Sequence, residues 1–144
     1  MKIYIRNKST NPLPEYATIG SSGMDLRANL DGKIRLNPLE RQLIPTGIYL
    51  EIPRGYEVQI RARSGLSIKH GITLVNGIGT IDSDYRGEIK VPIINLSSDS
   101  YEITDGERIC QMVLIKVEDI ELEEKEEFNK TKRGAGGFGH TGKK

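Results

Sequence analysis

The chain has 144 residues, of which 36% are apolar and 28% are charged, and its formal net charge is +1. This length fits one domain with a buried apolar core, and the near-neutral charge argues against a protein that wraps duplex DNA, which needs a large basic excess on one face. The sequence contains no run of about 18 apolar residues, which a membrane-spanning helix would need. Apolar and polar residues alternate over residues 1–6, whereas a signal peptide would begin with a continuous apolar segment. With the near-neutral charge, these features lead us to expect neither a membrane nor a nucleic-acid partner.

Short stretches in which apolar and polar residues alternate predict β-strands along most of the chain. They span residues 2–6, 33–36, 56–61 and 88–91. Residues 41–52 form an extended stretch that Pro45 and Gly47 interrupt. Residues 109–117 are nearly all apolar, which is typical of a strand covered on both faces. No window of a dozen residues keeps a helical period, and we expect residues 66–71 to form one helical turn at most.

Turn-forming residues separate these strands, since the chain contains 16 Gly and six Pro residues. This punctuation indicates an all-β sandwich or barrel, with no domain linker before about residue 117. Residues 118–127 hold six Glu and one Asp, as in a solvated segment. The glycine-rich residues 131–142 include Arg133 and Phe138, which favours a tail that folds onto something. We therefore divide the chain into a β domain (1–117) and an acidic connector with a flexible C-terminal arm (118–144).

Cysteine and histidine are scarce in this sequence. The single Cys110 excludes an intramolecular disulfide and is most simply a buried apolar residue. His70 and His140 are too few for a protein-ligated zinc site. The reducing cytoplasm is therefore the expected compartment.

The segment from Asn76 to Gly87 is the first candidate site. Its Asn76-Gly77 pair predicts a β-hairpin, because both residue types tolerate positive φ. Asp82 and Asp84 follow in the same segment. A plain surface hairpin with solvated aspartates is the alternative interpretation.

A second candidate site is the basic stretch Arg61–Ser67, which ends a predicted strand. Guanidinium groups, a hydroxyl and the backbone amides of a glycine turn together suit an anion, although a basic strand end is also possible. Ser64 does not indicate a serine hydrolase, because no His and Asp partners are arranged around it.

Two polar residues within predicted strands need an explanation. A buried Gln111 amide left without a partner would cost about 1–3 kcal/mol, so it either contacts a ligand or bonds to a neighbouring strand. Asp25 begins a strand, where it either supports a site or caps a turn.

Together these pieces resemble the homotrimeric dUTPase family, whose five motifs cover nearly the whole chain in the expected order. The motifs are Gly23–Ala28 (GMDLRA), Arg63–Leu66 (RSGL), Gly79–Ile89 (GTIDSDYRGEI), Gly106–Gln111 (GERICQ) and Arg133–Gly139 (RGAGGFG). One departure is His140, where many members carry Ser. It leaves open whether that side chain contacts the γ-phosphate.

The resemblance implies a jelly-roll-like β-barrel, a homotrimer whose active sites are each built from three chains, and an Mg²⁺ ion held by the substrate phosphates and water instead of by protein ligands. It also implies hydrolysis of dUTP to dUMP and pyrophosphate, which lowers dUTP and supplies dUMP for thymidylate synthesis. Asp82 would be the general base that activates water for attack on the α-phosphorus. Asp25 would support the site from behind the substrate-binding residues.

The residues implied to bind substrate come from four of the motifs and their neighbours. They are Arg63, Ser64, Gly65, Asn76, Gly79, Thr80, Ile81, Tyr85, Lys90, Gln111, Arg133, Phe138, Gly139 and Thr141.

Two other functions compete with this interpretation. A dCTP deaminase of the same fold would need a Glu proton shuttle and a pocket for cytosine, whereas residues 80–85 resemble the hydrolase. A non-enzymatic nucleotide sensor would have lost the catalytic Asp or the arm motif, and the sequence contains both.

Overall fold

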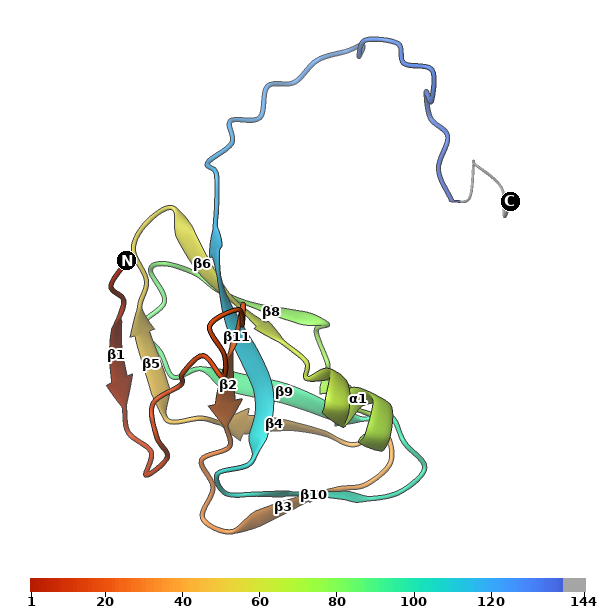
Figure 1. Cartoon of the computed structure of the whole chain (residues 1–144). Coiled ribbons are helices and arrows are strands. Elements are labelled where there is room, and N and C mark those ends of the chain that lie inside the picture. The colour runs from red at the N-terminus through yellow and green to blue at the C-terminus, as the bar shows by residue number, and fades with distance from the viewer. Residues whose placement is uncertain (139–144) are drawn as a thin grey trace.

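The computed structural model describes residues 1–138 and consists mostly of strands (Figure 1). The expectation of an all-β, jelly-roll-like fold is confirmed by the eleven strands and the short helix within these residues. The elements are β1 (Tyr4–Asn7), β2 (Met24–Arg27), β3 (Lys33–Leu36), β4 (Arg41–Pro45), β5 (Ile48–Glu51), β6 (Tyr56–Arg61), α1 (Ser64–His70), β7 (Ile72–Leu74), β8 (Ile78–Ile81), β9 (Lys90–Asn95), β10 (Tyr101–Thr104) and β11 (Arg108–Lys116).

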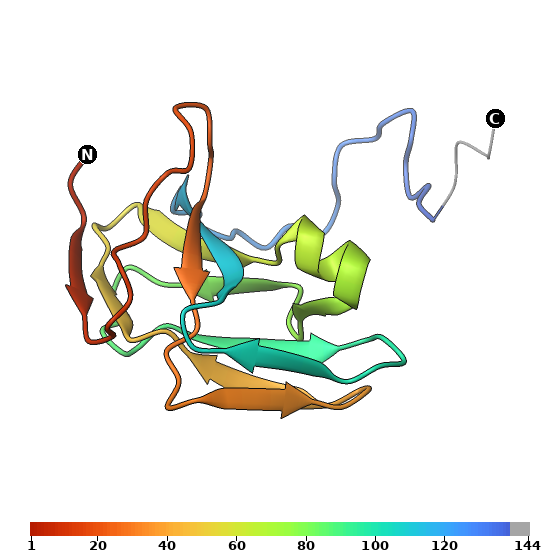
Figure 2. The ribbon, with the colours of Figure 1, turned by 60° about the horizontal axis from the view of Figure 1, so that its bottom comes forward.

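The described strands form four small antiparallel sheets. The largest has the order β2-β11-β6-β8, and a second has the order β4-β9-β7. The pairs β1-β5 and β3-β10 make the other two, and β3 and β10 lie together at the bottom of Figure 2. Strands that are neighbours in a sheet are mostly distant in sequence, so the fold is made by long-range pairing.

One apolar core joins the sheets. Alternate residues of β6, β7 and β9 point inward, as the two-residue period of a strand requires. In β11 the side chains of Ile109, Cys110, Met112 and Val113 are all buried, in agreement with a strand covered on both faces. The largest fully buried apolar side chains are Leu26, Leu36, Ile44, Ile89, Ile93 and Ile103.

Helix α1 is longer than the sequence analysis expected. It has seven residues, about two turns, and begins at Ser64 instead of residue 66. Burial of Leu66 holds it against the core, and Gly71 ends it in the left-handed conformation at φ 67°. The prediction of a single turn was wrong because so short a segment shows no period, and tertiary packing supplies its stability.

The predicted hairpin at Asn76-Gly77 was also wrong. The turn itself is present, with Gly77 at φ 70°. However, β7 pairs with β9 and β8 pairs with β6, so the turn leads the chain from one sheet to another. Turn chemistry is local and predicts a reversal, but it does not determine which strands then pair.

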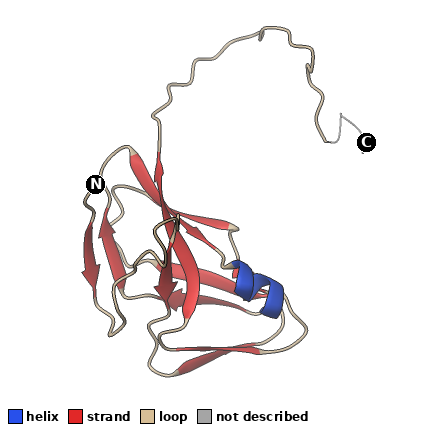
Figure 3. Ribbon diagram, viewed as in Figure 1, coloured by secondary structure: helices blue, strands red, loops and turns tan. Residues whose placement is uncertain are grey.

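Residues 117–138 form neither helix nor strand and lead away from the barrel (Figures 1 and 3). Their last ion pair with the β domain among the described residues joins Arg54 and Asp119, at 3.1 Å. Beyond it, Ile120, Leu122, Phe128 and Phe138 are all largely exposed. Within residues 1–138, no helix is both long and apolar enough to cross a membrane.

Candidate functional site

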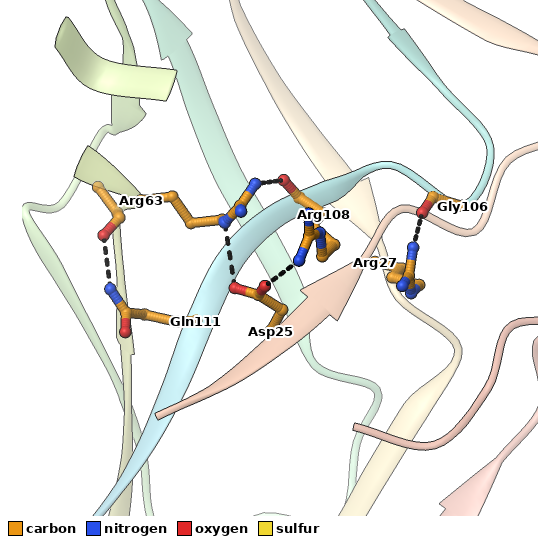
Figure 4. Close-up of polar contacts among 7 residues, drawn as sticks. Asp25, Arg27, Arg63, Gly106, Arg108 and Gln111 are labelled. Atoms are coloured by element: carbon orange, nitrogen blue, oxygen red, sulfur yellow. Dashed lines mark hydrogen bonds and ion pairs between the residues drawn. The ribbon is translucent and has the colours of Figure 1, made fainter. Parts of the chain in front are cut away.

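A carboxylate bridges two arginines where β2 lies beside β11 (Figure 4). Oδ1 of Asp25 lies 3.1 Å from Nε of Arg63, and Oδ2 lies 3.2 Å from Nη1 of Arg108. Arg63 also donates from Nη1 to the carbonyl oxygen of Arg108, at 2.9 Å. Asp25 and Arg63 each keep 28% of their side chain exposed, so this Asp25–Arg63–Arg108 cluster faces solvent and can reach a ligand.

A β-bulge makes this cluster possible. Asp25 is opposite Gln111 and Arg27 is opposite Arg108, so these four residues share a face of the sheet. Arg108 and Gln111 are three positions apart and would lie on opposite faces of a regular strand. The register shift between Arg108 and Cys110 adds one residue to β11 and turns Arg108 to the side of Gln111.

Gln111 sits at the edge of the same cluster. Its Nε2 donates to the carbonyl oxygen of Ala62 at 3.2 Å, directly before Arg63 (Figure 4). A Cβ added at Gly23 would lie 2.8 Å from Oε1 of Gln111, so only glycine leaves room for this amide. The amide therefore bonds to a neighbouring strand, and its half-buried Oε1 remains available to a donor.

Ser64 and Gly65 form the exposed first turn of α1, next to Arg63. No side chain caps this end of the helix, so the first backbone N–H groups have no partner of that kind. Arginines, a hydroxyl, an amide and free N–H groups are thus gathered in one place. This arrangement suits a phosphate chain.

The pKa values of two neutral groups near the cluster are raised. Burial, with a smaller contribution from Asp25, raises the pKa of the Cys110 thiol. Burial and the hydrogen bond to Glu107 raise the pKa of Tyr101. Both groups stay uncharged at neutral pH and add no negative charge near the two arginines.

The segment Asn76–Glu88 makes a second group of site residues. Gly79 is buried with Ile60 beside it, since a Cβ there would lie 3.2 Å from Cβ of Ile60. Asn76 and Thr80 are exposed, and Ile81 is half-buried. The segment thus presents exposed polar residues at Asn76 and Thr80, while Gly79 packs against β6.

Asp82 lies in the middle of this segment, directly after β8, and is exposed to solvent. It lines a surface pocket of about 520 Å³ together with Glu57, Asp84 and Arg86. The N–H of Tyr85 donates to the carbonyl oxygen of Asp82 at 3.2 Å, which closes a turn over residues 82–85. The carboxylate is therefore held on a compact turn and remains accessible to water.

The two groups lie at opposite ends of one sheet. Gln111 is opposite Arg61, and Arg61 is opposite Ile78, four residues before Asp82. Two strand spacings and four residues of strand separate the Cα atoms of Gln111 and Asp82 by about 16 Å. Arg63 lies further still in the opposite direction, so one chain does not bring the predicted phosphate site to the predicted base.

The remaining predicted site residues lie beside the second group or on the arm. Lys90 is exposed, and its Nζ is 3.8 Å from Oε2 of Glu88. Arg133 bonds within the arm, from Nε to the carbonyl oxygen of Gly136 at 2.7 Å, and Phe138 is fully exposed. The predictions for Gly139, His140 and Thr141 lie outside the described residues.

The sequence analysis missed two contributors to the cluster, Arg108 and Gly23. Both stood inside quoted motifs, but neither was given a role. No local pattern places Arg108 beside Asp25, because the bulge decides its side of the sheet. No local pattern shows that Gly23 must leave space for Gln111, because the two residues meet only when β2 pairs with β11.

A family model described as dUTPase matches residues 9–142, almost the whole chain. The chain belongs to the dUTPase family. Curated relatives match this chain over nine-tenths or more of its length. Deoxyuridine 5'-triphosphate nucleotidohydrolase of Finegoldia magna is 68% identical over 142 residues, which is 99% of each chain. Its counterpart in Fusobacterium nucleatum is 60% identical over 131 residues, covering 91% of this chain and 90% of the relative.

The fold is also that of solved dUTPases. The Staphylococcus bacteriophage 80alpha dUTPase with dUPNHPP matches with a TM-score of 0.88 over 98% of each chain, at 27% sequence identity. The similarity extends over the β-barrel and most of the arm, so the motifs occupy a dUTPase framework and not a fragment of one.

Proposed function

We propose that this chain hydrolyses dUTP to dUMP and pyrophosphate at sites shared between the subunits of a homotrimer. The observation that carries the proposal is the separation of Asp82 from the Asp25–Arg63–Arg108 cluster within one chain of a dUTPase framework. A neighbouring copy can supply the missing half, since closed cyclic oligomers bring different surfaces of identical chains together. The reaction would lower the concentration of dUTP. The cytoplasm is the proposed location.

Uracil would bind along the exposed edge of Asn76–Ile81. The Asn76 side chain and the backbone groups of Gly79, Thr80 and Ile81 can match its donors and acceptors. Cytosine reverses that pattern at two ring positions and would leave buried polar groups unpaired, which allows rejection by factors of about 10⁴ or more. Close packing of this segment around the base would exclude the methyl group of thymine.

Asp82 would orient a water molecule for in-line attack on the α-phosphorus and accept its proton. Its exposed position on the turn allows water to approach, and a positioned base contributes about 10²–10⁴ in rate. The remaining acceleration would come from holding the phosphates and stabilising their charge.

The phosphates would lie on the cluster of a second subunit. Arg63, Ser64, Gly65 and Gln111 provide donors for the α- and β-phosphates, and Asp25 holds the guanidinium of Arg63 in place. Lys90 would approach the ligand from the segment after Asp82, through its backbone.

The third subunit would lend its arm. Arg133 and Thr141 would close on the γ-phosphate, while Phe138 would stack on the uracil, with Gly139 allowing close approach. The complete exposure of Phe138 supports this role, because a bare aromatic ring gains most from being covered. Closure of the arm would expel water from the site.

Mg²⁺ is the proposed cofactor. It prefers oxygen ligands and keeps several waters. Among residues 1–138, no three His, Cys, Asp or Glu side chains are arranged to hold an ion. In this proposal the substrate phosphates and water supply the oxygen donors, and the bound ion would offset the triphosphate charge.

Pyrophosphate release from dUTP, dTTP, dCTP and UTP, measured with and without Mg²⁺, tests the proposal. We expect turnover of dUTP alone, and ammonia release from dCTP would indicate a deaminase instead.

Asp82→Asn should lower kcat for dUTP by about 10²–10⁴. Asp84→Asn is the matched control, since it removes a carboxylate from the same pocket. Native turnover by Asp82→Asn would refute the assignment of the base.

A further inference from the structure

Tyr85 is held in place by the residues that follow it. Its hydroxyl donates to the carbonyl oxygen of Glu88 at 3.0 Å, so the ring folds back across Gly87. Tyr85 is 43% exposed and lies on the turn that also carries Asp82. Its direction depends on these local contacts, because core packing does not enclose it.

Gly87 leaves the space that the ring occupies. A Cβ added at Gly87 would overlap the hydroxyl oxygen and Cζ of Tyr85 and would lie 2.9 Å from Cε2. The backbone of Gly87 is outside the left-handed region, so its conformation does not itself require glycine. The position of the Tyr85 ring is therefore what excludes a side chain at residue 87.

Glu88, whose carbonyl accepts the Tyr85 bond, is anchored to the barrel. Its Oε1 accepts a hydrogen bond from the N–H of Gly47 at 2.8 Å. The next residue, Ile89, is fully buried, and its N–H donates to the carbonyl oxygen of Ile48 at 2.8 Å. The hydroxyl of buried Thr46 donates to the carbonyl oxygen of Ile89 at 2.6 Å. The acceptor for Tyr85 thus belongs to the rigid part of the fold.

We propose that Gly87 and the anchored Glu88 are specificity-positioning residues, which hold Tyr85 at the angle that excludes a ribose 2′-hydroxyl. This inference rests on the proposed function, in which Tyr85 lies against the deoxyribose. Gly87 touches no substrate and acts only by leaving room for the ring. Glu88 acts through its backbone carbonyl, which fixes the far end of that ring.

Gly87→Ala separates this role from the presence of the tyrosine. The added methyl group displaces the end of a side chain that is 43% exposed and not enclosed by the core, so the thermal midpoint should stay near that of the native protein. The ratio of kcat/KM for dUTP to that for UTP should fall at least tenfold, approaching the ratio of Tyr85→Ala. Tyr85→Phe, which removes only the bond to Glu88, should lower the same ratio by a smaller factor.

A double-mutant cycle makes the test decisive. With Tyr85→Ala in place there is no ring to displace, so adding Gly87→Ala should leave the ratio unchanged. Gly20→Ala is the matched control, because Gly20 has an ordinary φ and nothing within 4 Å of the added Cβ. An unchanged ratio in Gly87→Ala, or a further fall in the double variant, would overturn the proposal.

Equilibrium binding distinguishes this failure from failure of the proposed function. The affinities of all variants for dUMP and UMP, measured by calorimetry, give a discrimination ratio without catalysis. If the native protein binds dUMP over UMP and Gly87→Ala keeps that preference, only the role of Gly87 is wrong. If the native protein shows no such preference, both the role of Tyr85 and this inference are wrong.

Discussion

At the scale of single residues, the Asp25 carboxylate orients two guanidinium groups, those of Arg63 and Arg108. Asp25→Asn removes the charge that orients Arg63 and Arg108 while preserving the volume of the side chain. Because misplaced donors bind a phosphate chain less well, we expect kcat/KM for dUTP to fall about 10–100-fold. Glu102→Gln, which breaks the exposed bridge to Lys33, should leave kcat/KM unchanged. Equal effects of the two substitutions would contradict a positioning role for Asp25.

The buried thiol of Cys110 should make the free energy of unfolding fall at alkaline pH. Burial raises the pKa of its thiol in the folded chain, so the native state keeps a proton that the unfolded state loses above about pH 8.5. The stability from this group is present below that pH and is lost as the pH rises. At pH 10 the loss should reach about 2 kcal/mol.

The measurement is urea unfolding from pH 7 to pH 10 of the native protein and of Cys110→Ala. Tyr101, whose pKa is also raised, is common to both proteins and cancels in the comparison. Parallel pH curves would show that the thiol does not contribute.

The site could be predicted residue by residue only where its chemistry is local. Asp25, Arg63 and Gln111 were predicted as candidate residues, and the structure brings them together. Arg108 was not predicted, because a bulge turns it toward Asp25 and the residue pattern does not reveal that bulge. The joining of Asp82 to these residues stays a prediction, because it depends on contacts between chains.

At the scale of elements, Gly71 links helix α1 to the neighbouring loop. Its φ is 67°, and a Cβ there would lie 2.7 Å from the backbone nitrogen of Ser97. Gly71→Ala therefore adds a steric conflict to the cost of a left-handed residue, and we expect it to lower the free energy of unfolding by about 2–5 kcal/mol.

Gly55→Ala is the control that separates these two effects. Gly55 has φ 82° but no atom within 4 Å of the added Cβ. It should cost only about 1–2 kcal/mol, from the left-handed backbone alone. Equal losses of stability in the two variants, measured by urea unfolding, would show that Ser97 yields without strain.

The positions of the strands follow from local sequence patterns, whereas their order in the sheets depends on long-range pairing. Residues 33–36 and 56–61 form strands at the predicted positions, because alternation of apolar and polar residues reports one buried face. The sheet order could not be predicted, since pairing such as β6 with β11 joins residues about fifty positions apart. The same limit explains why Asn76-Gly77 was mistaken for a hairpin.

At the scale of the whole molecule, the described part of the arm beyond Asp119 forms hydrogen bonds only with itself. The last ion pair between the arm and the barrel, among the described residues, is at Asp119. The 22 residues from Val117 to Phe138 can extend up to about 70 Å. A domain the size of residues 1–117 has a radius of gyration of only about 13 Å. The arm is therefore long enough to reach a site on a neighbouring subunit, where Phe138 could be covered.

Shared sites predict that two inactive variants restore each other's activity. Asp82→Asn chains lack the base, and Gln111→Ala chains lack a phosphate donor, so oligomers of either variant alone should be nearly inactive. After the two are unfolded and refolded together in equal amounts, about a quarter of sites should combine a native Asp82 from one chain with a native Gln111 from another. Pyrophosphate release from dUTP should then recover to about a quarter of the native rate. Mixing the folded variants without unfolding is the control, because their chains do not exchange. If each site were built within one chain, every site in the refolded mixture would still lack one residue, and activity would stay at the level of the two variants.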